Sequence, residues 1–290
     1  MATNTPFGQR LGLVLEGGAM RGIYTAGVLD VFLEAGIMPD VVVGVSAGAL
    51  HGCSYVAGQK GRSIRYYRKY RSDKHFMGLY SLLTTGDVVG TKFCYEDIPL
   101  RLDPFNEAAF EKAPVDFYVT VTNVRTGKPE YILCDELKVG SKMDVIRAGA
   151  SMPLCSKMVE WNGNLYLDGG VSDSIPYAKM KDFGCRKSIV VLTQPAGYLK
   201  QPAAMAPFEA MYRKYPAFVK AMRGRDQMYN TEVCAVEQAA KQGNVFLIRP
   251  SKLLHVGRME HDIEVLNAQY ELGRQDARSQ MDAMREWMER

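Results

Sequence analysis

The chain has 290 residues, of which 47% are hydrophobic and 23% charged, and its formal net charge at pH 7 is +4. This length and apolar content suit one large α/β domain or two small ones, and we expect a single domain over residues 1–290. A charge this small, with no nucleic-acid-binding motif beside it, excludes nucleic acid as the expected partner. The N-terminus lacks the apolar core of a signal peptide, and no apolar run approaches the roughly 20 residues that span a bilayer.

The six cysteines are spread singly along the chain, with no CxxC pair, zinc-knuckle spacing or dense disulfide framework. Reduced thiols are the rule in the cytoplasm. We therefore expect a cytoplasmic protein that holds no metal and no cofactor.

The first predicted unit is a pair of strands joined by a helix. Residues 11–15 and 41–45 are short aliphatic runs of the kind found in parallel strands buried on both faces. The stretch 23–35 between them is amphipathic, so the three segments predict a βαβ unit. A further helix is predicted to begin directly after Ser46.

Two antiparallel hairpins are predicted next. Residues 117–124 and 129–133 have the composition of two strands, with a short turn between them. The second hairpin lies in MVEWNGNLYLDGG, residues 158–170, where Asn162 and Gly163 predict a type I′ turn.

The last third of the chain predicts further strands and more helix. Residues 188–193 and 244–249 are further buried strands, and the proline-rich segment 195–207 leads into a helical C-terminal portion from about residue 196. Apolar residues recur at helical spacing over 263–288 and predict one closing helix. The sequence thus predicts the α/β fold class, with a central, mostly parallel sheet.

The turn after the first strand, GGAMRG at residues 17–22, leads into the first predicted helix. Glycines let a ligand approach the backbone closely, and the first amides of a helix have no partner inside it. Such a turn attracts negative charge, either a nucleotide phosphate or an oxyanion formed during a reaction. Arg21 would anchor a phosphate or order the loop, or it is a solvated arginine in the first helical turn.

A nucleotide site has less support from the residues than an oxyanion site. Ala19 stands where the second glycine of G-x-G-x-x-G would be, and no Lys-Ser/Thr pair of a P-loop follows. Ser46, rather than an acidic residue suited to a ribose, ends the second strand. A dinucleotide-binding module remains the minority interpretation.

The sequence GVSAG, residues 44–48, is a G-x-S-x-G motif between a predicted strand and a predicted helix. This is the setting of a nucleophile elbow, where a sharp turn exposes the serine and its neighbours must be small. The alternative is a serine that only caps the helix. A serine nucleophile needs a base, and Asp168 is the candidate, because it ends a predicted strand and two glycines follow it. By itself Asp-Gly-Gly is a common surface turn.

These three motifs, in this order and at these boundaries, resemble the patatin-like phospholipases over about residues 11–193. The resemblance implies a three-layer α/β/α fold and a hydrolase that cleaves lipid acyl esters on a Ser-Asp dyad without histidine or metal. It makes Ser46 the nucleophile and Asp168 the general base. The later part of the chain looks more like a bacterial branch of the family.

The resemblance also assigns the oxyanion hole to Gly17, Gly18 and Ala19, with Arg21 as a substrate-binding residue. The family usually has a third glycine where this chain has Ala19. Two alternatives stay open: a carboxylesterase for small esters on the same dyad, and a catalytically silent module that binds a lipid or a nucleotide.

Two further segments bear on the lipid partner. Residues 60–74 hold seven basic residues and three tyrosines, which suits peripheral contact with an anionic membrane or an ordinary solvated helix face. Residues 77–90 are apolar with a glycine near each end, and burial in the core is their simplest role, with an acyl pocket or a lid as the alternatives.

Overall fold

The computed structural model describes residue 6 and residues 8–290, and these form one eight-stranded sheet. Each strand in the order β5-β6-β3-β2-β1-β7-β8 is hydrogen-bonded to the next, and β4 is also paired to β3. Strands β3, β2, β1, β7 and β8 run parallel, whereas β4 and β6 run antiparallel to β3 and β5 runs antiparallel to β6. The strands are β1 (Arg10–Leu15), β2 (Val41–Val45), β3 (Asp116–Asn123), β4 (Pro129–Leu133), β5 (Val159–Trp161), β6 (Asn164–Asp168), β7 (Cys185–Val191) and β8 (Val245–Ile248).

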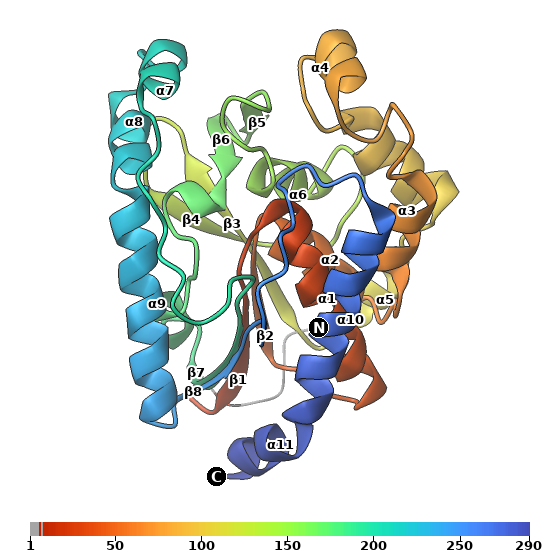
Figure 1. The fold of residues 1–290 in the computed structure, drawn as a ribbon, viewed down its shortest axis with the longest axis vertical. Helices are drawn as coiled ribbons and strands as arrows, with labels where there is room; N and C mark the ends of the chain where they lie inside the picture. The colour runs from red at the N-terminus through yellow and green to blue at the C-terminus, as the bar shows by residue number, and fades with distance from the viewer. Residues whose placement is uncertain (1–5, 7) are drawn as a thin grey trace.

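Helices cover both faces of this sheet, as Figure 1 shows. The α-helices are α1 (Ile23–Glu34), α2 (Ala47–Val56), α3 (Arg62–Tyr70), α4 (Leu79–Thr85), α5 (Glu107–Lys112), α6 (Met143–Gly149), α7 (Ala206–Met211), α8 (Pro216–Arg223), α9 (Arg225–Lys241), α10 (Ile263–Ser279) and α11 (Met281–Glu289). The shorter or wider helices are the 3₁₀ turns η1 (Ala19–Gly22), η3 (Gly169–Val171) and η4 (Ala178–Lys181) and the π-helix η2 (Phe93–Leu102).

The alternation of side chains along β1 assigns the two faces. Leu13 and Leu15 pack in a core with residues of α1, α2, α6 and α10, whereas Val14 packs in a second core with residues of α9. Successive residues of a strand point to opposite faces, so the fully apolar run in β1 requires both faces to be covered. The result is the three-layer α/β/α arrangement that the sequence predicts (Figure 1).

Helix α10 packs directly on α1 through two glycines. A Cβ at Gly27 would lie 2.1 Å from the Tyr270 carbonyl oxygen, and one at Gly273 would lie 2.1 Å from the Tyr24 carbonyl oxygen. Any larger residue at either position would push the two helices apart.

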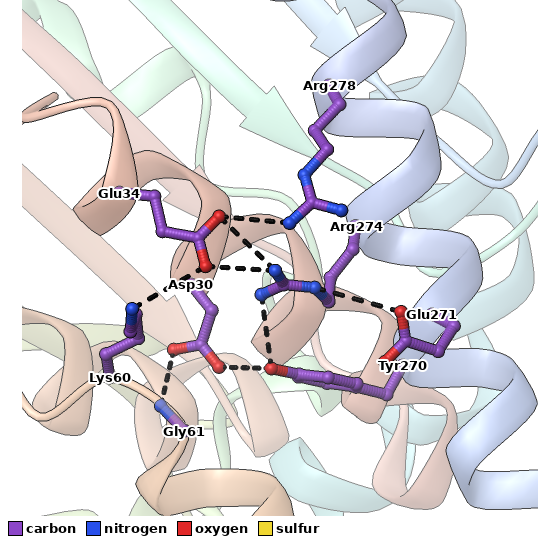
Figure 2. A network of polar contacts seen from close by, with 8 residues as sticks. All are labelled: Asp30, Glu34, Lys60, Gly61, Tyr270, Glu271, Arg274 and Arg278. Carbon is purple, nitrogen blue, oxygen red and sulfur yellow. Dashed lines mark hydrogen bonds and ion pairs between the residues drawn. The ribbon is translucent and has the colours of Figure 1, made fainter.

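Polar contacts close the same interface, as Figure 2 shows. The Tyr270 hydroxyl donates to Asp30 at 2.6 Å, while Arg274 and Arg278 pair with Glu34 at 2.9 and 3.1 Å. These contacts join α10 to α1 of the βαβ unit that carries the first sequence motifs.

The structure confirms most predicted elements and corrects two. The two hairpins form as predicted, and Asn162 and Gly163 both have the positive φ of a type I′ turn. The single closing helix was wrong, because Ser279 and Gln280 side chains both donate to the Asp276 carbonyl and end α10 before α11 begins.

The prediction that residues 77–90 are buried in the core is wrong for α4, although Val88 near the end of the segment is buried. Leu79 and Leu83 of α4 are 69% and 76% exposed, and α4 projects from one end of the molecule (Figure 1). Within residue 6 and residues 8–290, no helix combines the length and apolar character needed to cross a bilayer.

Candidate active site

Ser46 lies in a sharp turn between β2 and α2. Its φ of 52° and ψ of −122° are values that residues with a side chain rarely adopt. A Cβ at Gly44 would lie 2.5 Å from the Cα of Ala49, and a Cβ at Gly48 would lie 2.3 Å from the Leu15 carbonyl oxygen. Glycine is therefore required at both positions of the G-x-S-x-G motif, because nearby backbone atoms leave no room for a side chain.

The sheet register brings Asp168 to the same place. Strand β4 pairs along one edge of β3, so β2 and β6 share the other edge. Val45 of β2 lies opposite Thr120, and Asp168 of β6 lies opposite the next residue, Val121. Because β6 runs antiparallel to β2, the carboxyl ends of the two strands meet, which places Asp168 beside Ser46.

The two side chains form a direct hydrogen bond. Ser46 Oγ donates to Asp168 Oδ2 at 2.6 Å, and the Gly170 amide donates to Asp168 Oδ1 at 2.8 Å. Burial raises the pKa of Asp168, while the Ser46 hydroxyl and the Arg225 charge act in the opposite direction. The site thus holds a serine hydroxyl against a buried carboxyl of raised proton affinity.

The glycine turn packs against this pair. A Cβ at Gly17 would lie 2.8 Å from the Cβ of Ser46, and one at Gly18 would lie 2.7 Å from Thr193 Oγ1. Ala19 has a φ of 50°, in the region that favours glycine, which matches the third glycine expected there. The turn is therefore held close to Ser46 by positions that exclude or strain a side chain.

Two cavities meet at Ser46 and Ala19. The apolar cavity has a volume of about 100 Å³ and runs under α3 and η2, with walls that include Leu50, Tyr66, Tyr67, Phe76, Tyr95 and Ile98. The polar cavity has a volume of about 210 Å³, and its lining includes Glu16, Arg21, Asp168, Lys200, Arg225 and Arg258. An apolar group and a polar group joined at one reactive bond would fit this arrangement.

The histidines lie elsewhere. Neither cavity has a histidine in its lining. His51 is buried with its ring centroid 6.1 Å from that of Tyr67, and neither of its ring nitrogens has a hydrogen-bond partner among the described residues. Burial lowers the pKa of His51 to about 4, so the ring is neutral at pH 7.

The tyrosines of the basic stretch 60–74 pack inside the protein, whereas five of its seven basic residues are exposed. Tyr66, Tyr67 and Tyr70 are buried, as are Arg62 and Arg71. These tyrosines are therefore wall and core residues rather than exposed interfacial aromatics.

The sequence motifs gave no indication of Lys200, Arg225, Tyr229 or Arg258, which also line the polar cavity. All four follow the segment that carries the motifs, and a single cation or tyrosine outside a motif gives no pattern that distinguishes it from other residues. Arg21 was the cation expected at this site, and it lines the polar cavity beside the glycine turn.

Known relatives are similar to most of the chain or to a part of it. The protein YjjU of Escherichia coli (strain K12) is 28% identical over 273 residues, covering 91% of this chain and 75% of YjjU. The lysophospholipase nte1 of Aspergillus terreus is 30% identical over 182 residues, covering 61% of this chain but 11% of the much longer fungal protein. The solved structure of VipD from Legionella pneumophila superposes with a TM-score of 0.46 at 13% identity, covering 96% of this chain and 67% of VipD.

Two protein families match different regions of the chain. A domain of unknown function, DUF6363, matches residues 215–289. The patatin-like phospholipase description matches residues 13–180, which include the glycine turn, Ser46 and Asp168. The chain therefore belongs to the patatin-like phospholipases and is a lipid hydrolase.

Proposed function

We propose that this protein hydrolyses the acyl ester bond of phospholipids, lysophospholipids or related lipids on a Ser46–Asp168 dyad. The observation that carries the proposal is the 2.6 Å hydrogen bond from Ser46 Oγ to Asp168 Oδ2 at the point where the two cavities meet. The relative from Aspergillus terreus is named a lysophospholipase, which supports the same substrate class.

In the first step, Ser46 Oγ attacks the ester carbonyl carbon while its proton moves to Asp168. The tetrahedral intermediate collapses, the bond to the alcohol oxygen breaks, and Asp168 returns the proton to the departing alcohol. Water then attacks the acyl-Ser46 ester with Asp168 as base, releasing the fatty acid and restoring the serine. Burial of Asp168 supports this role, because it raises the proton affinity of the carboxylate.

Backbone amides of the glycine turn would stabilise the negative charge on the intermediate. Gly17 packs on Ser46, and η1 begins at Ala19, so amides at the start of a helical turn lie beside the reacting group. One such donor contributes roughly 3 kcal/mol in other hydrolases. We assign the oxyanion hole to Gly17, Gly18 and Ala19.

The apolar cavity would hold the acyl chain. Met77 and Val89 line it and pair with each other just outside α4, so the cavity leads toward the exposed leucines of that helix. Lys74 lies 4.5 Å from the ring of Tyr80, adding a cation beside this apolar surface. We propose that α4 contacts the surface of an anionic membrane, together with exposed cations of residues 60–74 such as Lys69.

We further propose that the chain works as one domain, and in the cytoplasm. Strand β8 belongs to the same sheet as β1, and α10 packs on α1. All six cysteines are unpaired, as in proteins of a reducing compartment.

The test is release of fatty acid from defined lipids by the wild-type protein and by Ser46→Ala and Asp168→Asn. We expect each variant to lose on the order of a thousandfold or more in kcat, with Asp182→Asn, a change at an exposed carboxyl, as the control. Full activity of either dyad variant would overturn the proposal. Faster hydrolysis of butyryl than of palmitoyl esters would favour the carboxylesterase alternative.

A further inference from the structure

The polar cavity carries more positive charge than the dyad requires. Arg21 and three cations of the later part of the chain, Lys200, Arg225 and Arg258, line it. Among the residues that the structure describes, none of the four forms an ion pair within 4.0 Å with a carboxylate. Like charges held together in a partly desolvated cavity repel one another, and a bound anion would relieve that repulsion.

Arg225 is the first residue of α9 and reaches the loop after Asp168. Its Nε donates to the Gly170 carbonyl oxygen at 2.5 Å. In the described part of the chain this bond uses one of the five N–H groups of the guanidinium, which leaves the others for a ligand. Burial lowers the pKa of Arg225, and the nearby Asp168 opposes that effect.

Lys200 is held in place by α9. Asn230 accepts from the Lys200 amide at 2.9 Å and donates to the Lys200 carbonyl oxygen at 3.1 Å. The ammonium lies 4.2 Å from the ring centroid of Tyr229. Burial, followed by the charge of Arg225, lowers the pKa of Lys200 to about 8, which is the effect expected of a cation among cations.

Arg258 lies at the exposed rim of the cavity, on a loop that is itself anchored. The buried Arg71 donates from Nε to the Glu260 carbonyl oxygen at 2.6 Å and from a terminal nitrogen to the Met259 carbonyl oxygen at 2.9 Å. The Glu260 carboxylate in turn accepts from the Asp262 amide at 3.0 Å. The loop thus has a fixed path past the cavity.

The two carboxyl groups that line the same cavity, Glu16 and Asp168, offset only part of the positive charge. Glu16 is 3% exposed and accepts from the Thr193 amide at 2.6 Å, and burial raises its pKa. Asp168 is engaged with Ser46. Two carboxyl groups against four cations leave an excess of positive charge in the cavity even when both carboxyls are ionised.

We infer that the polar cavity binds an anionic phosphate group on the head group of the acyl ester, through Arg21, Lys200, Arg225 and Arg258. This inference rests on the proposed function, because it names the class of ester that Ser46 attacks. A phosphate accepts several charge-assisted hydrogen bonds at once, and the three-carbon backbone of a glycerolipid sets it a few bonds from the ester. A cavity of about 210 Å³ has room for such a group, since a water takes roughly 30 Å³ in the liquid. The later part of the chain thereby sets head-group preference.

The test measures binding to the Ser46→Ala protein, so that it does not depend on turnover. The probes share one oleoyl chain and differ in head group: lysophosphatidate, lysophosphatidylcholine and monooleoylglycerol, each below its critical micelle concentration. We expect lysophosphatidate to bind at least about tenfold more tightly than monooleoylglycerol. Adding Arg258→Gln or Lys200→Met should each reduce that preference by about tenfold, the size of one charged hydrogen bond. Lys214→Met, at an exposed lysine that lines neither cavity, is the matched control and should keep the preference.

Three results would overturn the inference. The first is equal affinity for the three lipids, and the second is a preference that Arg258→Gln and Lys200→Met both leave unchanged. The third is inorganic phosphate or glycerol 3-phosphate binding as tightly as lysophosphatidate, because the cavity would then be a site for free phosphate. Arg258 is exposed, so its replacement spares the core. If the wild-type protein does not hydrolyse lipids, the proposed function is refuted, but the binding results are not affected. Failure of the proposed function and failure of this inference are therefore distinguishable.

Discussion

The Nε atom of Arg225 donates a hydrogen bond to the Gly170 carbonyl oxygen at 2.5 Å, and the Gly170 amide donates to Asp168 at 2.8 Å. Through these two bonds the first residue of α9 fixes the loop that holds the proposed base. The DUF6363 match begins at residue 215 and so includes Arg225, which means that the matched C-terminal region reaches the dyad.

The first prediction concerns pH. Asp168 must be ionised to accept the Ser46 proton, and its pKa is raised by burial, so kcat/KM should fall as pH drops through that raised pKa. Arg225 lowers the pKa of Asp168, so Arg225→Gln should move the fall to higher pH, and Arg225→Lys should move it less. The measurement is the pH profile of kcat/KM on an uncharged ester. Such an ester has no charged head group, so the profile does not include the pH dependence of head-group binding. An unshifted acid limb in folded Arg225→Gln would contradict the electrostatic link.

The second prediction concerns the glycine turn. In Gly17→Ala the new Cβ would lie 2.8 Å from the Cβ of Ser46 and 2.9 Å from the Val45 carbonyl oxygen, so the turn or the serine must move. We expect kcat to fall by at least about tenfold, in keeping with loss of an oxyanion donor elsewhere. The matched control is Gly224→Ala, whose Cβ would meet nothing closer than 3.8 Å. If the folded Gly17→Ala protein had an unchanged kcat, the assignment of the glycine turn as the oxyanion hole would be wrong.

The third prediction is that no histidine takes part in the reaction. His75, His255 and His261 are exposed, and His51 is buried and neutral and lines neither cavity. Each His→Gln protein should keep ester hydrolysis within about tenfold of the wild type, whereas Asp168→Asn should lose a thousandfold or more. Circular dichroism checks that His51→Gln, the one buried change, remains folded. If a folded histidine variant lost as much activity as Asp168→Asn, the dyad mechanism would be wrong.

The fourth prediction concerns the membrane surface. Replacing Leu79 and Leu83 together with serine should weaken binding to anionic vesicles, because both side chains are exposed on α4. Hydrolysis of a soluble short-chain ester should change far less than vesicle binding. Met38→Ser is the control, since Met38 is also exposed but precedes the amino end of β2, at the other end of that strand from Ser46. Equal vesicle binding by the double variant and the wild type would exclude α4 from the contact.

The sequence could predict the parts of the site whose local chemistry is distinctive. The turn around Ser46 needs glycine at 44 and 48 because backbone atoms approach both, so its motif is visible in the chain. The strands around it are aliphatic because both faces of the sheet are buried. The end of a predicted strand followed by two glycines made Asp168 a candidate base, and the resemblance to a family distinguished it from an ordinary turn residue.

The rest depends on contacts that no local pattern encodes. Asn230 holds the Lys200 backbone at the polar cavity, and Arg71 holds the backbone of Met259 and Glu260, the two residues that follow Arg258. The exposure of α4 likewise depends on where the chain is carried after α3, since its apolar sequence alone suits a core. Tertiary placement decided these cases.

The most direct test of the Ser46 nucleophile is labelling with an alkyl fluorophosphonate followed by peptide mass spectrometry. Serine Oγ forms a bond to phosphorus and fluoride leaves, so the adduct marks the attacking atom. We predict a single adduct on Ser46, slowed strongly in Asp168→Asn and missing in Ser46→Ala. Labelling of another residue, or lipid hydrolysis that persists undiminished in Ser46→Ala, would contradict the account.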